Sequence, residues 1–378
     1  MEKIKVFYLV YYLTSGGIEK YSIDLYKHIN KEKFKIDFIT KFEREEFYDV
    51  ILQELGGRKI ALSKECKKVS SINRIQDIKK VNSILSQGYD IAYFNLSEPT
   101  AVFKYPFICR MHGIKRIIIH SHNSNEENTG IIKNFLNCLA RVYLNYIATE
   151  RFACSDKAAL WMYGKKIAHK KLYTHICNGI ELKKYTYNPE IRDMIRKQLR
   201  LKKDILVVGH IGRFSEQKNH LFLLEIFKSI LKVKADAILM LIGVGKLKEE
   251  IAEYGKKIGI HNHVLFLGER KDVNQLLQAM DVFLLPSFYE GLPIAGIEAQ
   301  ASGLSCVFSD TISKEADITG NVSFVSLEKS ANYWAEVAIN SARGKRKSQE
   351  EAIAAAGYNI NLTAEIIQQK MEEMMNIG

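Results

Sequence analysis

Two stretches of the C-terminal half carry residue types that could hold a diphosphate and a sugar. Arg213 and Lys218 follow an apolar, strand-like run that ends at Ile211. Glu290 and Glu298 follow a second run of this kind further along the chain. Guanidinium and ammonium groups beside a helix N-terminus suit the charge of a diphosphate, and carboxylates accept hydrogen bonds from sugar hydroxyl groups. The two pairs together predict a site for a nucleotide diphosphate sugar.

Each pair also has a plainer interpretation, which the spacing alone leaves open. Gly212 permits the turn before Arg213, and the two cations could simply be surface charges at that turn. Glu290 is expected in a loop, and Glu298 in the first turns of a helix over residues 297–301. An acidic side chain at that position could stabilise the helix N-terminus instead of binding a ribose.

Glycine occurs at further strand ends, where it lets a ligand approach the backbone closely. Gly16 and Gly17 follow the first strand, and Gly243 follows the strand that ends at Ile242. Backbone groups around Arg270, after another strand, could pair with a nucleotide base. Ordinary turn glycines are the alternative, because the third glycine of the dinucleotide fingerprint is missing after Gly17.

Two histidines end the strand expected over residues 116–120, in the order His120-Ser121-His122-Asn123. We expect one of them to form a hydrogen bond with a sugar or phosphate oxygen. A structural histidine is the alternative for one of the two. A metal site is disfavoured, because no acid or further histidine stands at helical spacing to complete a set of ligands.

Strand-like and helix-like segments alternate along the whole chain, which predicts parallel sheets with helices on both faces. In the first half the expected strands are residues 4–10, 35–40, 58–62, 90–95, 116–120, 151–154 and 173–177. In the second half they are residues 205–211, 237–242, 264–267, 282–285, 306–308 and 323–325. The fold class is therefore α/β with doubly wound sheets, which bind ligands beyond the carboxyl ends of their strands.

The length of 378 residues predicts two domains. Residues 183–204 are polar and basic and contain a proline, so we expect them to link an N-terminal domain, residues 1–182, to a C-terminal domain, residues 205–361. A last helix is expected within residues 362–378, because no strand follows its pattern. Each domain is then large enough for one doubly wound sheet.

The net charge of +12 is concentrated in the N-terminal half. Residues 1–180 hold 29 Lys and Arg against 18 Asp and Glu, whereas residues 203–378 hold 19 against 22. A nucleic-acid partner is disfavoured, because the basic half shows no recognition module and no interleaving of aromatic and basic residues. An anionic membrane surface or a phosphate-bearing acceptor fits this charge better, and a solvated Lys-rich surface is the alternative.

Membrane and redox signals favour a cytoplasmic protein. The six cysteines are scattered without a Cys-x-x-Cys pair, so we expect neither disulfides nor a zinc site. Residues 1–13 are interpreted as the first strand rather than as a signal peptide, and no apolar run has the length of a membrane span. Residues 131–147 carry an apolar stripe at helical spacing, which we expect to face the core rather than a membrane.

The motifs occur in a fixed order along essentially the whole chain. They are Gly16-Gly17-Ile18-Glu19, His120-Ser121-His122-Asn123, Asn178-Gly179-Ile180, Gly209-His210-Ile211-Gly212-Arg213 and Gln217-Lys218-Asn219-His220. The most specific is Glu290 and Glu298, separated by seven residues and followed by Ala299-Gln300-Ala301-Ser302-Gly303. This ordered set resembles the family-4 retaining glycosyltransferases of the GT-B type, in particular those of bacterial capsule and exopolysaccharide synthesis. The resemblance implies two Rossmann-like domains that face each other across a cleft, with the last helix crossing back onto the N-terminal domain.

The resemblance also implies roles for the site residues. Arg213 and Lys218 would bind the donor diphosphate and stabilise the leaving nucleotide. The turns at Gly212, Gly243 and Arg270, which the sequence itself indicates, could line the same site. Glu298 would bind the ribose, and Glu290 would face the donor sugar. Either Gly16 or Gly17 would close over the phosphates, and His122, in preference to His120, would contact the transferred sugar. The amides that would contact sugar or phosphate are those of Ile294 and Ala295.

One loop departs from the family pattern, which commonly reads Gly-Phe-Gly-Leu-Pro after the first glutamate. Here the stretch reads Gly291-Leu292-Pro293-Ile294-Ala295-Gly296. Pro293 lacks an amide hydrogen and so removes one donor from a loop expected to face phosphate or sugar. The identity of the donor sugar is left open by this change more than the class of reaction.

The expected activity is transfer of a hexosyl unit from a nucleotide diphosphate sugar to a lipid-linked or polysaccharide acceptor, with retention at the anomeric carbon. UDP is favoured over GDP as the nucleotide, and the inner membrane face is the expected location. No cofactor and no metal are expected, because Arg213, Lys218 and helix amides would carry the developing charge. The alternatives are a sugar-nucleotide epimerase or phosphorylase on the same fold and a non-catalytic sugar-nucleotide-binding subunit.

Overall fold

The chain divides into two compact units in its computed structural model, which describes residues 2–64, 71–122 and 130–376. Unit 1 comprises Met1–Ile180 together with Gly357–Gly378, and unit 2 comprises Glu181–Ala356. Asn123 of the histidine motif and Cys66 lie outside the described residues.

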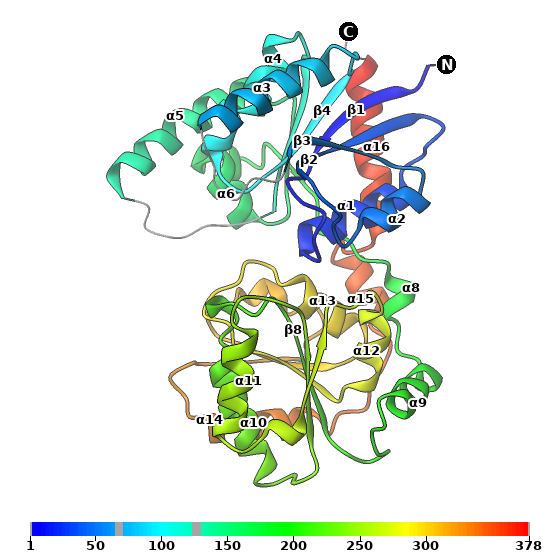
Figure 1. The fold of residues 1–378 in the computed structure, drawn as a ribbon, viewed down its shortest axis with the longest axis vertical. Helices are drawn as coiled ribbons and strands as arrows, with labels where there is room; N and C mark the ends of the chain where they lie inside the picture. The colour runs from blue at the N-terminus through cyan, green and yellow to red at the C-terminus, as the bar shows by residue number, and fades with distance from the viewer. Residues whose placement is uncertain (1, 65–70, 123–129, 377–378) are drawn as a thin grey trace. The chain divides into compact units, whose positions relative to one another are not determined.

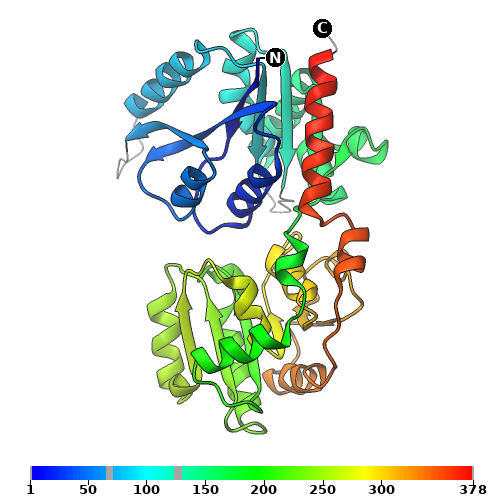
Figure 2. The same ribbon diagram turned by 90° about the vertical axis from the view of Figure 1, so that its right-hand side faces the viewer.

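Unit 1 is built on a parallel sheet that, in the described residues, has the strand order β3-β2-β1-β4-β5-β6-β7 (Figures 1 and 2). Its strands are β1 (Ile4–Leu9), β2 (Phe34–Glu43), β3 (Arg58–Lys64), β4 (Ile91–Leu96), β5 (Arg116–Ser121), β6 (Glu150–Ala153) and β7 (Thr174–His175). Its helices are α1 (Gly17–His28), α2 (Asp49–Glu54), α3 (Ser71–Leu85), η1 (Pro99–Phe103), α4 (Tyr105–Met111), α5 (Ile131–Ile147), α6 (Asp156–Tyr163), α7 (Lys165–His169) and α16 (Ile360–Asn376).

Both faces of this sheet are buried, because alternate residues of each strand enter different cores. Phe7 and Leu9 of β1 pack with residues of α3, α4, α5 and α6. Val6 and Tyr8 pack on the other face with residues of α1, α2 and α16. The strand expected over residues 4–10 is thus an interior strand of a doubly wound sheet.

Unit 2 repeats this architecture with the parallel strand order β10-β9-β8-β11-β12-β13. Its strands are β8 (Val207–Ile211), β9 (Ile238–Ile242), β10 (Val264–Gly268), β11 (Val282–Leu285), β12 (Ser305–Ser309) and β13 (Val322–Val325). Its helices are α8 (Leu182–Tyr185), α9 (Pro189–Gln198), η2 (Glu216–Lys218), α10 (His220–Leu231), α11 (Lys248–Lys257), η3 (His261–His263), α12 (Val273–Ala279), α13 (Ile294–Ala301), η4 (Lys314–Ala316), α14 (Ala331–Ser341) and α15 (Glu350–Ala355). Every strand expected from the sequence is confirmed, with ends that differ by three residues or fewer.

The segment expected to be a linker, residues 183–204, contains α9 and part of α8 and belongs to unit 2. Arg192 and Arg196, one helical turn apart on α9, donate to the two carboxylate oxygens of Asp281 at 2.5 and 2.7 Å. Arg196 is buried and also donates to the carbonyl of Ala279 at 3.0 Å. Two arginines of this basic segment therefore pair within unit 2, a contact that composition alone does not reveal.

The last helix, α16, belongs to unit 1. Its buried residues Ile360, Ala364, Ile367, Met371 and Met374 join the core that α1 forms on β1. Figure 2 shows α16, in red, running along the sheet of unit 1.

The expectation that the apolar stripe of α5 faces the core is wrong for most of its members. Ala140, Leu144 and Ile147 are buried, but Ile132, Phe135, Leu136, Leu139, Val142 and Tyr146 are exposed. The helix carries two apolar faces, and the sheet can cover only one of them. Among the residues that the structure describes, no helix is both long enough and apolar enough to cross a bilayer.

Candidate functional site

The strand order of unit 2 reverses between β8 and β11, which are neighbours in the sheet. Loops that leave two such strands in opposite directions open a crevice at the carboxyl edge of an α/β sheet, and ligands bind there. Arg213 and Lys218 lie in the segment after β8, and Glu290 lies in the loop after β11. The structure therefore brings three of the four residues of the predicted site to one reversal point.

Lys218 and Glu290 form an ion pair across this reversal point. Their side chains are only 15% and 10% exposed, so solvent screens the pair weakly. Ser287 donates a hydrogen bond to the same carboxylate oxygen of Glu290 at 3.0 Å. A diphosphate that binds the ammonium group of Lys218 would compete with Glu290 for it.

Two further bonds hold the loops of the pair together. The amide of Phe288 donates to the carbonyl of Gln217 at 2.8 Å. The side-chain amide of Gln217 donates to the carbonyl of Tyr289 at 2.9 Å. The position of Lys218 relative to Glu290 is thus determined by backbone contacts as well as by their charges.

Arg213 precedes Lys218 by five residues in the segment after β8, and its side chain is exposed. Within the part of the chain that the structure describes, its guanidinium group has no ion pair and no hydrogen bond. Gly212 matters for more than the turn: a Cβ there would lie 3.1 Å from Cδ and Cε of Lys218. The absence of a side chain at this position lets the Lys218 stem lie against the backbone next to Arg213.

Gly243 supports the same loop from the end of β9. It has a φ of +142°, and a Cβ would lie 2.1 Å from the carbonyl oxygen of Gly212. The amide of Gly212 donates to the carbonyl of Ile242 at 3.0 Å, and that of Phe214 to the carbonyl of Val244 at 2.9 Å. Gly243 therefore permits the close contact between two loops, and its predicted contact with a nucleotide stays a prediction.

Arg270 is engaged within its own loop. Its Nε and Nη2 donate to the two carboxylate oxygens of Asp272 at 2.7 and 2.6 Å. A side-chain contact with a ligand would have to displace this two-pronged pair. The backbone around Arg270, which the sequence indicated for base pairing, remains the part of this loop suited to that role.

Glu298 lies in the second turn of α13, because the helix begins at Ile294, three residues earlier than expected. A helix dipole acts mainly on the first turn, so the interpretation of Glu298 as a cap residue is disfavoured. Its carboxylate is 4% exposed and accepts a hydrogen bond of 2.8 Å from the hydroxyl of Tyr185 in α8. Sequence reasoning missed Tyr185, which stands in the expected linker and has no motif around it.

The start of α13 accommodates the proline that departs from the family pattern. Pro293 caps the helix, and its carbonyl accepts from the amides of Gly296 and Ile297 at 2.9 and 3.2 Å. Its missing amide therefore costs the helix no hydrogen bond. Ile294 and Ala295 are the first two helical residues, whose amides have no partner within a helix.

Two buried histidines beneath the site were not predicted from the sequence. Nδ1 of His210 lies 2.8 Å from the carbonyl oxygen of Leu284, and the His210 and His220 rings are 4.7 Å apart. Burial lowers the pKa of His210 well below its ordinary value, and burial with the nearby charge of Lys218 lowers the pKa of His220 to about 4. Both rings are neutral near pH 7 and leave the positive charge of the site to Lys218 and Arg213.

In unit 1 the turn after β1 is held by a buried acid. The amide of Leu13 donates to Glu46 at 2.7 Å. Gly16 caps α1, and a Cβ there would lie 2.1 Å from Oε2 of Glu19. Gly17 is the first residue of α1. Gly16 thus leaves room for the Glu19 carboxylate, and the predicted approach of Gly16 or Gly17 to phosphates stays a prediction.

His120 and His122 are buried at the end of β5, with ring centroids 3.8 Å apart. The hydroxyl of Tyr93 lies 2.7 Å from Nδ1 of His120. Both ring nitrogens of His122 lie 2.7 Å from side-chain amides, Nδ1 from Asn178 and Nε2 from Asn95. A sugar contact by His122 would have to replace one of these amides.

The pKa values of the two rings fit this burial. Burial lowers the pKa of His120 well below its ordinary value, and it lowers the pKa of His122 to about 4. Both rings are therefore neutral near pH 7 and lack the imidazolium proton that a general acid would donate. Within the described residues, no group of three or more His, Cys, Asp and Glu could hold a metal ion.

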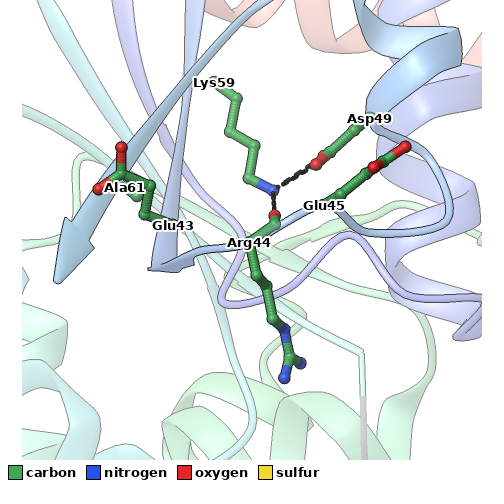
Figure 3. Close-up of a pocket in the computed structure, with 6 residues that line it drawn as sticks. All are labelled: Glu43, Arg44, Glu45, Asp49, Lys59 and Ala61. Atoms are coloured by element: carbon green, nitrogen blue, oxygen red, sulfur yellow. Dashed lines mark hydrogen bonds and ion pairs between the residues drawn. The ribbon is translucent and has the colours of Figure 1, made fainter. Parts of the chain in front are cut away.

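A cavity of about 420 Å³ opens beside β2 and β3 of unit 1, lined by Glu43, Arg44, Glu45, Asp49, Lys59 and Ala61 (Figure 3). Lys59 donates to both carboxylate oxygens of Asp49, at 2.9 and 2.7 Å, and to the carbonyl of Arg44 at 2.8 Å. Its charge is thus neutralised within the cavity wall. None of the residues predicted for the site lines this cavity.

Comparison with known proteins gives the family. Residues 191–356 match the sequence model described as Glycosyl transferases group 1. The chain is 31% identical over 363 residues to the putative glycosyltransferase EpsF of Bacillus subtilis, covering 94% of this chain and 93% of that protein. It is 27% identical over 321 residues to the UDP-Gal:alpha-D-GlcNAc-diphosphoundecaprenol alpha-1,3-galactosyltransferase of Escherichia coli, covering 82% and 80%.

Solved structures agree on the fold. Anabaena HepE in complex with UDP and glucose matches with a TM-score of 0.77 at 18% identity, covering 98% of this chain and 99% of that chain. Sucrose-phosphate synthase of Thermosynechococcus elongatus matches with a TM-score of 0.77 at 16% identity and full coverage of both chains. These neighbours confirm the two parallel-sheet α/β domains of the GT-B type. With its family model, its full-length relative and its fold in agreement, the chain belongs to the group 1 glycosyltransferases.

Proposed function

We propose that the chain transfers a hexosyl unit from a UDP-sugar to a lipid-linked or growing polysaccharide acceptor, with retention at the anomeric carbon, in capsule or exopolysaccharide synthesis. The observation that carries the proposal is the reversal point of unit 2, where the segment after β8 presents an exposed Arg213 and pairs Lys218 with Glu290 of the loop after β11. The names of two relatives support the context, one a galactosyltransferase that uses a diphosphoundecaprenol-linked sugar and one a capsular polysaccharide glycosyltransferase, CapH of Staphylococcus aureus.

The donor diphosphate is the natural ligand for this arrangement. As the bond between the anomeric carbon and the diphosphate breaks, negative charge grows on the leaving group. Arg213 and Lys218 would stabilise that charge, together with the first amides of α13, so the leaving step calls for no metal. Displacing Glu290 from Lys218 would free its carboxylate at the position where the resemblance expects the donor sugar.

The ribose is assigned to Glu298. A carboxylate accepts two hydroxyl hydrogen bonds well, and Tyr185 fixes its orientation from α8. Because Glu290 is the one carboxylate proposed to face the sugar, a double displacement between two flanking acids is disfavoured. We propose instead that the acceptor hydroxyl attacks from the face that the diphosphate leaves, and that its proton passes to a phosphate oxygen.

A panel of UDP- and GDP-hexoses tests the donor. A ligand that binds only the native protein raises its unfolding temperature, so a UDP-hexose should raise it and the matched GDP-hexose should not. Release of UDP should then depend on an undecaprenyl diphosphate sugar as acceptor. Release without acceptor together with a changed sugar would favour an epimerase, and binding without any release would favour a non-catalytic subunit.

A further inference from the structure

Unit 1 exposes a concentrated apolar surface that the transfer reaction does not explain. Of the 21 large apolar side chains that the described residues expose, nine lie between residues 99 and 147. Six of them line α5 and are 45–78% exposed: Ile132, Phe135, Leu136, Leu139, Val142 and Tyr146. Single exposed apolar residues are ordinary on a soluble protein, but a gathered patch marks an interaction surface.

These six residues form one face of α5, because they recur at spacings of three and four. The opposite side of the helix, at Ala140, Leu144 and Ile147, is already buried against the sheet of unit 1. Figure 1 shows α5 at the edge of this unit, with its N-terminal turns extending beyond the neighbouring helices. The fold therefore does not require apolar side chains on the outer face of α5.

The patch continues onto η1 and α4. The Phe103 ring stacks on Tyr143 of α5 with centroids 5.8 Å apart, and Phe107 lies 6.1 Å from the same ring. Met111, at the end of α4, is also exposed. We call this surface, formed by the six residues of α5 with Phe103, Phe107 and Met111, the α5 face.

Cations outnumber acids in the segment that forms the α5 face. Residues 99–147 contain six Lys and Arg against two Glu. Lys133 lies on α5 itself and is 3.6 Å from Glu98, and Arg110 of α4 acts electrostatically on Tyr143. Apolar and aromatic side chains flanked by cations are the composition of helices that lie in a bilayer interface, with the cations near lipid phosphates.

We propose that the α5 face binds the surface of an anionic phospholipid bilayer, with α5 lying in the interface. A second copy of this chain fits less well, because a symmetric contact would bring the cations of both copies together. The proposal goes beyond the transfer reaction and stands independently of the donor and the acceptor. It also differs from a general attraction by charge, because it requires the apolar side chains.

Vesicle flotation with the full chain tests the proposal. Vesicles of phosphatidylcholine with phosphatidylglycerol should carry the protein, and vesicles of phosphatidylcholine alone should carry at least about tenfold less. The variant Phe135→Ser with Val142→Ser should lose at least about tenfold in binding to the anionic vesicles. The matched control is Leu172→Ser with Val233→Ser, which removes two comparably exposed apolar side chains elsewhere and should bind normally.

The unfolding temperature is the control for folding, and the substitutions of exposed residues should leave it unchanged. The rise in unfolding temperature with UDP-hexose is the control for an intact donor site. Equal binding of the wild type and the Phe135→Ser, Val142→Ser variant would overturn the proposal, as would no binding to anionic vesicles. A dimer seen by light scattering that this variant abolishes, with no vesicle binding, would assign the surface to self-association instead. A failed UDP-hexose shift with intact vesicle binding would count against the proposed function alone.

Discussion

Lys218 and Glu290 stand 72 residues apart in the sequence and contact each other in the structure. Their residue types and positions after two strands were sufficient to predict a shared site. That they pair with each other, and that Ser287 and Gln217 hold them, could not be predicted, because hydrogen bonds between loops leave no periodic pattern. Tyr185 and Asn95 were missed for the same reason: each meets a predicted site residue through a long-range hydrogen bond, Tyr185 with Glu298 and Asn95 with His122.

Replacing Lys218 by Gln tests its proposed role on the leaving diphosphate. The amide can still donate to Glu290 but carries no charge, so we expect kcat to fall by about 100-fold or more. UDP release with acceptor present measures the effect. Lys234→Gln, at an exposed lysine outside the site, is the control; near-normal turnover of the Lys218 variant would remove this residue from the mechanism.

Replacing Tyr185 by Phe tests whether Glu298 is oriented from α8. The change removes a hydrogen bond to a buried carboxylate, worth about 1.5–3 kcal/mol. We expect a several-fold rise in KM for the donor, with a smaller change in kcat, in steady-state measurements. Tyr187→Phe is the matched control, since the Tyr187 ring lies under the guanidinium group of Arg346; equal KM values in the two variants would contradict the assignment.

The buried histidines predict how stability depends on pH. The folded-state pKa of His220 is about 4, below the ordinary value of 6.5. The unfolded chain therefore binds more protons between these values, so stability is fully present above pH 6.5 and is lost as the pH falls toward 4. Thermal unfolding of His220→Gln from pH 4 to 7 should show a shallower loss than the wild type; an unchanged slope would show that this ring does not titrate as inferred.

At the scale of elements, strands were the most predictable feature. Short apolar runs bounded by turn residues identify strands buried on both faces, and both sheets confirm them. Helix α5 shows where such patterns fail. Periodicity locates an apolar face but does not say what covers it, and here one face packs on the sheet while the other remains exposed.

Gly243 provides a test of how elements pack, because it lies where the loop after β9 contacts the loop after β8. A Cβ would collide with the carbonyl oxygen of Gly212, so Gly243→Ala should lower the free energy of unfolding by about 3 kcal/mol or more. Gly259→Ala is the matched control: its φ is +80° but a Cβ there meets nothing within 4 Å, so we expect a loss of about 1 kcal/mol. Denaturant unfolding measures both, and equal losses would show that loop contact at Gly243 is unimportant.

At the scale of the whole molecule, the chain forms two parallel-sheet units, and the motifs are divided between them. The model of the group 1 family matches residues 191–356. Alternation of strands and helices was enough to predict the architecture. The structure of the expected linker was harder to predict from the sequence. The cations of α9 are typical of a solvated segment, but in the structure Arg192 and Arg196 both pair with Asp281. The tertiary structure determines which acidic and basic side chains form ion pairs, and these pairs cannot be predicted from composition.

The central claim is that the reversal point of unit 2 binds the diphosphate of a UDP-sugar. Calorimetric titration of UDP into the wild type, Arg213→Gln and the exposed control Arg343→Gln tests it most directly. We predict that the wild type and Arg343→Gln bind equally and that Arg213→Gln binds at least about tenfold more weakly, because a charge-assisted contact is lost. Equal affinity of all three proteins, or no binding of UDP by the wild type, would contradict the account.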